Sequence, residues 1–141
     1  MSERTNVSNI GVSGQYRTYK IDDSTITYDA TKTGGSAAVG LAVTLSAANT
    51  VALAADGDAV IGKLILVESD NKANVMTHGT MALPGGNGAT LTLGSKIVGA
   101  LGASSAKGYI RSAASGTAAE LVKARGYIDN AGTTTAVEVT L

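Results

Sequence analysis

The sequence of 141 residues contains no cysteine, no phenylalanine and no tryptophan, and it has one histidine and one proline. Without cysteine the chain forms neither a disulfide bond nor a thiolate metal site. Stability beyond that of its own core must therefore come from association with copies of itself or with a partner. Five tyrosines are the only aromatic residues. The core must be built mainly from valine, isoleucine, leucine and alanine.

Long hydrophobic runs and an excess of one charge are missing as well. No apolar run approaches the roughly 18 residues that a membrane-spanning helix needs, and residues 1–20 lack a hydrophobic stretch suited to secretion. Eleven basic and eleven acidic residues give a formal net charge of zero. Nucleic-acid binding usually requires a basic surface that neutralises phosphates. The sequence therefore predicts no nucleic-acid partner and no membrane partner.

The charges are unevenly distributed along the chain. Basic residues outnumber the single acidic Glu120 between residues 89 and 128, and acidic residues outnumber the single basic Lys63 between residues 56 and 70. Two interpretations are open: an ordinary solvated surface, or a charged surface that faces an oppositely charged neighbour.

The hydrophobic pattern indicates many short strands within one domain. Apolar residues alternate with polar ones in short runs that are separated by turn residues such as the Asp-Gly of residues 55–58. Strands are expected at residues 39–45, 50–53, 60–68, 74–83, 89–93, 96–101, 108–112, 124–129 and 135–141. Such a pattern is typical of an all-β protein, and we predict a small single-domain β-sandwich or barrel.

Residues 1–38 differ from this pattern. Residues 1–15 contain few apolar side chains, and residues 16–28 alternate well enough for two short strands. We expect a flexible or extended N-terminal arm with short strands over residues 1–38, followed by a β-rich domain over residues 39–141. On this reading, deleting residues 1–30 leaves the β-rich domain folded.

Tyr16, Tyr19 and Tyr28 lie in the expected arm and are candidate interface residues. Tyrosine combines a large contact area with a polar tip and is favoured at interfaces. Local core packing is the alternative role for each of them.

At most one short helix is expected, within residues 115–124. Ser115 or Thr117 is placed to cap its start, and Leu121 together with Ala118 or Val122 is expected to face the core.

His78 is the residue around which an active site would have to be built. A Ser-His-Asp site needs a nucleophile within reach of the base, but strand alternation places the hydroxyl of Thr77 on the opposite face. One histidine cannot supply a zinc or copper site within one chain, although three copies could meet on a three-fold axis. We expect His78 to lie on a central strand, in packing or hydrogen bonding, with an interface contact or a shared metal site as alternatives.

Other chemical motifs are weak. Asp56 and Asp58 resemble the start of a calcium loop, but position 12 of that loop is Val67 instead of a bidentate glutamate. No glycine-rich phosphate-binding motif follows a strand. The sequence therefore predicts no enzyme and no cofactor.

Three stretches carry a resemblance to a known family. They are AVTLSAANTVALAADGDAVIGKLILVESDNKANVMTHGTMALPGG (42–86), LTLGSKIVGALGASSAKGYIRSAAS (91–115) and ARGYIDNAGTTTAVEVTL (124–141). The first stretch contains, in order, a VTL strand, NTVAL, a DGD turn, a VIG-type strand and a THG strand that runs to Leu-Pro. Together with the other two stretches, this succession resembles the capsid decoration, or cement, proteins of tailed bacteriophages. The likeness covers roughly residues 39–141.

The resemblance implies a structural protein on the exterior surface of the virion. Such proteins are made in the host cytoplasm, bind the major capsid protein of the expanded head as homotrimers at three-fold and quasi-three-fold positions, and often lay an N-terminal arm across neighbouring subunits. The competing hypothesis is a carbohydrate-binding or adhesin-like β-sandwich on a tail or cell surface, although such sites commonly use aromatic platforms that this chain has in short supply. An enzyme that uses His78 is the third possibility.

Overall fold

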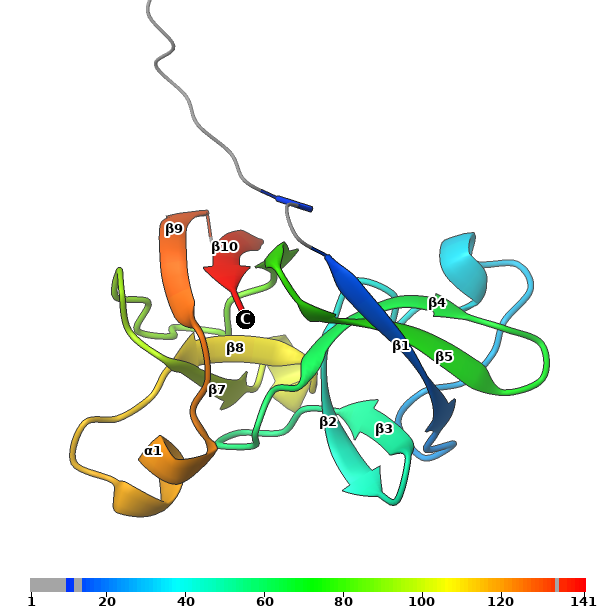
Figure 1. The fold of residues 1–141 in the computed structure, drawn as a ribbon, viewed down its shortest axis with the longest axis horizontal. Coiled ribbons are helices and arrows are strands. Elements are labelled where there is room, and N and C mark those ends of the chain that lie inside the picture. The colour runs from blue at the N-terminus through cyan, green and yellow to red at the C-terminus, as the bar shows by residue number, and fades with distance from the viewer. Residues whose placement is uncertain (1–9, 12–13, 134) are drawn as a thin grey trace, which may run out of the picture.

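The structure is a computed structural model that describes residues 10–11, 14–133 and 135–141, and it consists mainly of strands (Figure 1). The strands are β1 (Gln15–Ile21), β2 (Ala42–Ala47), β3 (Thr50–Leu53), β4 (Gly62–Val67), β5 (Lys72–His78), β6 (Thr80–Leu83), β7 (Ile97–Ala100), β8 (Tyr109–Ser112), β9 (Tyr127–Thr133) and β10 (Ala136–Thr140). The described part also contains the helix α1 (Ala118–Lys123) and two single 3-10 turns, η1 (Thr33–Gly35) and η2 (Ala103–Ser105). The prediction of a small all-β protein with one short helix is confirmed.

The strands form one barrel and two smaller sheets. Five strands close the barrel in the order β1-β3-β2-β4-β5, in which β1 runs antiparallel to β5 and parallel to β3. Beside it lie a three-stranded sheet with the order β6-β10-β9 and the two-stranded ribbon β7-β8. Figure 1 shows the barrel on the right and the smaller sheets with α1 on the left. No helix among the described residues is long and apolar enough to cross a membrane.

The buried apolar side chains divide into two cores. The barrel core is formed by residues from all five barrel strands, among them Val51, Leu64 and Val75, each with no exposed surface. The second core lies between the barrel and the smaller sheets, where Met76 of β5 packs with side chains such as Ile128 of β9. Alternate residues of β5 therefore serve different cores, as the period of two in a strand requires.

The segment from residue 14 to residue 38 is part of the barrel and differs from the expected arm. β1 pairs with two other barrel strands, and Ile21, Ile26 and Ala38 are buried in the barrel core. Residues 22–28 form a turn and a loop in place of the expected second short strand. Deleting residues 1–30 would therefore remove a strand from a closed barrel. Residues 1–9 and 12–13 of the expected arm lie outside the described residues.

Two further strand predictions need correction. Residues 74–83 form two strands in different sheets, because Gly79 between them adopts a φ of 107° that favours glycine. Its N–H and C=O both pair with Leu141, which turns the chain from the barrel into the three-stranded sheet. Residues 89–93 alternate like a strand but contain none, and their backbone is held in part by the Ser112 hydroxyl, which accepts a hydrogen bond from the Thr92 N–H.

The helix lies where it was expected but buries none of its residues. α1 begins after Thr117, whose side chain makes no capping hydrogen bond. Leu121 is 43% exposed and Val122 is 86% exposed, so the prediction that they face the core is wrong. The helix projects from the molecule at the lower left of Figure 1.

Candidate interaction surface

The outward side chains of β1, β5 and β4 form a surface on the barrel that is interrupted at Met76, which is buried in the second core. In these strands the residues of one parity, such as Ile21, Val75 and Leu64, point into the barrel core, and those of the other parity point away from it. The register places Tyr16 beside Met76 and Met76 beside Lys63, while Lys20 lies beside Lys72. We define the cationic face as the outward residues Tyr16, Thr18, Lys20, Lys63, Lys72, Asn74 and His78.

The cationic face carries positive charge that its own side chains do not neutralise. It contains no acidic residue, and none of Lys20, Lys63 and Lys72 makes an ion pair within the described part of the chain. Lys20 and Lys72 are directly paired across β1 and β5, an arrangement of like charges that destabilises a sheet. Burial lowers the pKa of Lys63 below its ordinary value. A partner surface with carboxylates would offset both the repulsion between Lys20 and Lys72 and the desolvation of Lys63.

Tyr16 and His78 lie at neighbouring ends of β1 and β5. Tyr16 is 53% exposed, and its hydroxyl lies over Gly14, where an added Cβ would be 3.2 Å from the Tyr16 oxygen. A register shift between Gln15 and Tyr16 pairs His78 with Gln15. His78 is exposed at the end of β5, and its Nδ1 is 3.0 Å from the Thr77 Oγ1. The expectation that strand alternation separates the Thr77 hydroxyl from His78 is therefore wrong at this irregular strand end.

The other two candidate tyrosines lie elsewhere. Tyr19 is half-buried and packs against the barrel core, which is the local packing role considered for it. Tyr28 is 40% exposed and lines a separate hollow with Leu66 and Glu68. The structure thus brings two of the four candidates together and separates the other two from them.

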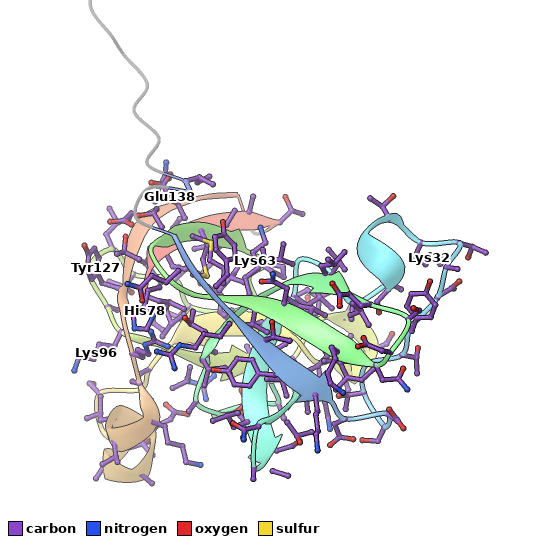
Figure 2. All side chains as sticks on the ribbon, turned by 45° about the vertical axis from the view of Figure 1, so that its right-hand side comes forward. Lys32, Lys63, His78, Lys96, Tyr127 and Glu138 are labelled. Atoms are coloured by element: carbon purple, nitrogen blue, oxygen red, sulfur yellow. The ribbon has the colours of Figure 1, made fainter. Side chains whose placement is uncertain are left out.

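Tyr127 is an exposed aromatic residue that the sequence analysis did not select. Its side chain is 48% exposed on β9, whose register pairs it with Thr140. The next residue, Leu141, bonds to Gly79 beside His78, so the backbone places Tyr127 and His78 near the same corner of the molecule. Figure 2 shows both labelled side chains on the left. Aromatic type alone would have selected Tyr127, but its location depends on the long-range pairing of β9 with β10.

The basic segment between residues 89 and 128 is partly neutralised within the molecule. Arg111 donates from Nε to the Asp56 Oδ1 at 2.9 Å and pairs with both carboxylate oxygens of Glu120. Glu120 also accepts the Ala114 N–H at 2.7 Å. The hydrogen bonds from Arg111 lower the pKa of Glu120 to about 2, and the two carboxylates raise the pKa of Arg111. This network joins β8, α1 and the loop after β3.

The two aspartates that resemble the start of a calcium loop stabilise the loop after β3. Asp56 binds Arg111, and the Asp58 carboxylate accepts the Ala55 N–H at 2.9 Å, as in an ordinary turn. Among the described residues, no group of three or more His, Cys, Asp or Glu side chains could hold a metal ion.

Arg125 joins the second core to the barrel. Its guanidinium is half-buried and donates to the Ile61 carbonyl at 2.9 Å and to the Thr77 carbonyl at 2.6 Å. Burial lowers its pKa below the ordinary value, but an arginine stays charged at any physiological pH. Its backbone forms a bridge with Ile97 of β7. Arg125 therefore fixes the end of β5 that presents His78.

A hollow of about 690 Å³ lies beside the Arg111 network. It is lined by backbone, small side chains and the hydroxyls of Thr90, Thr92 and Ser95, together with Asp56 and Arg111. Both charged groups are already paired with each other, and His78 does not line the hollow. The hollow thus lacks a general base next to a nucleophile.

Comparisons of the chain with models of known protein families, with curated proteins and with solved structures found no match. The likeness to capsid decoration proteins therefore stays a prediction from the residues quoted above.

Proposed function

We propose that this chain is a structural virion protein that binds the exterior of the expanded head of a tailed bacteriophage. It bridges major capsid protein subunits and stabilises the head, and it acts as a homotrimer at three-fold and quasi-three-fold positions. The proposal rests on the sequence resemblance. The observation that supports it best is the cationic face, which combines an exposed tyrosine with three lysines that lack ion pairs among the described residues.

The cationic face has the properties of a docking surface for an acidic protein. Lys20 and Lys72 supply positive charge that steers and orients a partner, and Tyr16 supplies contact area at the edge. The strands beneath them are held in a closed barrel, so little conformational entropy is lost when a partner binds. A ligand that binds only the assembled shell stabilises it by mass action, and contact with several subunits raises the effective concentration of each contact.

The test is co-sedimentation of the purified protein with heads of its own phage that lack it, in expanded and unexpanded form. We expect saturable binding to expanded heads alone, with a copy number in proportion to three-fold sites. Lys20→Glu should weaken binding by roughly tenfold, because it places a carboxylate where the partner's carboxylates approach. Lys107→Glu is the matched control, since Lys107 is an exposed lysine outside the cationic face.

No binding to either form of the head would contradict the proposal. Equal loss of head binding in Lys20→Glu and Lys107→Glu would show that the cationic face is not the surface that binds the head. In the first case a glycan array is the next measurement, because the hydroxyl-lined hollow near Arg111 suits a polar ligand such as a sugar.

A further inference from the structure

α1 is a surface helix that packing does not explain. It has six residues, none of them buried, and Val122 is 86% exposed. A helix this short is not stable in isolation, and exposed apolar side chains contribute nothing to folding. Its position is instead fixed by Glu120, which binds Arg111 and the Ala114 N–H, and by Arg125 just after the helix. The molecule thus holds Leu121 and Val122 in place on its exterior.

The last residue of α1, Lys123, is an exposed lysine. Arg111 pairs with both Asp56 and Glu120, so Lys123 is the charged residue of α1 that makes no ion pair within the described part of the chain. Lys96 is also exposed, and the residue after it, Ile97, bridges to Arg125. We define the α1 knob as Leu121, Val122 and Lys123. It combines two exposed apolar side chains with one exposed lysine.

The opposite end of the molecule carries a hollow with complementary properties. The hollow measures about 660 Å³ and includes the exposed apolar side chains of Tyr28 and Leu66. Glu68 and Asp70 line it together with Lys32, so carboxylates are in excess. Its wall is tightly packed, because an added Cβ on Gly35 of η1 would lie 1.9 Å from the Val67 carbonyl oxygen of β4. We refer to this site as the Tyr28 hollow.

We propose that the α1 knob of one copy of this chain docks in the Tyr28 hollow of a second copy. The apolar side chains of the knob meet Tyr28 and Leu66, and Lys123 meets the carboxylates of Glu68 and Asp70. The hydrogen bonds of Glu120 hold α1, and the wall of the hollow is tightly packed at Gly35, which limits the entropy lost on binding. The two surfaces lie at opposite ends of the long axis (Figure 1), so the contact is head-to-tail and joins copies in a row. It goes beyond the proposed function, which assigns no surface to the contact between copies.

Disulfide trapping tests this contact, because the chain has no cysteine of its own. Three single variants are made: Val122→Cys in the knob, Ser69→Cys in the lining of the hollow, and Ser46→Cys as an exposed serine control on β2. The proteins are mixed in pairs at high concentration in a glutathione redox buffer. We expect the Val122→Cys and Ser69→Cys pair to form at least tenfold more mixed dimer than the Val122→Cys and Ser46→Cys pair.

A charge exchange provides the second arm. Lys123→Glu added to the knob variant should abolish the enrichment, and Glu68→Lys added to the hollow variant should restore it. Equal trapping of the two pairs, or loss without restoration, would overturn the proposal. The experiment uses no capsid, so its outcome is independent of the outcome of head binding.

Discussion

Arg111 and Lys20 show how differently two basic residues can act within one small protein. Arg111 is enclosed by Asp56, Glu120 and the Ser112 carbonyl, and its charge is used inside the fold. Lys20 faces another lysine across two strands and has no ion pair within the described residues. Arginine suits the first role because its planar group binds carboxylates through several donors. Only the second residue offers charge to a partner.

The pairing of Glu120 predicts a pH dependence of stability. Its folded pKa of about 2 lies below the ordinary 4.5, so the ionised form stabilises the folded state. This contribution is complete above about pH 5 and is lost as the pH falls toward 2. Glu120→Gln should unfold at lower urea concentration than wild type at neutral pH, and the difference should shrink at about pH 3.

Urea midpoints of the two proteins across this range provide the measurement, with Glu68→Gln as the control because Glu68 is exposed and makes no ion pair among the described residues. Parallel curves for wild type and Glu120→Gln would show that the ion pair contributes nothing to acid sensitivity.

At the scale of the element, the N-terminus can be shortened only as far as the start of β1, because β1 closes the barrel. Deleting residues 1–13 leaves all ten described strands, and the hydrogen bond from the Gly11 N–H to the Thr80 carbonyl is lost with it. Deleting residues 1–21 removes β1 and opens the barrel. We expect the shorter deletion to keep the native circular dichroism spectrum and the longer one to lose it.

The same pair of deletions separates folding from binding. If residues 1–13 reach neighbouring subunits, the shorter deletion should bind heads less tightly than the full chain while it stays folded. Unchanged head binding would show that residues 1–13 make no contact with neighbouring subunits. A folded protein without β1 would contradict the closure of the barrel through β1.

Local sequence patterns predicted where the strands lie better than they predicted which strands pair in space. The strand at residues 50–53 has the predicted bounds, because Asp-Gly and similar turns mark its ends. The break at Gly79 was missed because glycine alone does not reveal whether a strand bends or changes sheet. The pairing of His78 with Gln15 depends on a register shift between distant strands. Leu121 and Val122 have a pattern suited to burial, yet no element covers them among the described residues.

At the scale of the whole molecule, the barrel core and the second core belong to one structural unit. Met76 of β5 belongs to the second core while its neighbour Val75 belongs to the barrel core, and Arg125 bonds across the junction. A defect in either core should therefore weaken the entire fold. Cooperative unfolding of one unit is also usual for small domains of this length.

Leu64→Ala in the barrel core and Ile128→Ala in the second core should each lower the free energy of unfolding by about 2–5 kcal/mol. Both side chains are almost fully buried. Denaturant unfolding followed by amide NMR signals from β2 and from β10 should give one midpoint for both regions in each variant. Separate midpoints would show that the cores unfold independently.

The placement of β10 between β6 and β9 has a consequence for synthesis of the chain on the ribosome. All five barrel strands have been made once residue 78 has been added. The three-stranded sheet has no central strand until residues 136–140 follow, so β6 and the apolar side chains of Met81 and Leu83 must wait for it. The barrel can therefore form early during translation, whereas the surface around His78 and Tyr127 is assembled last.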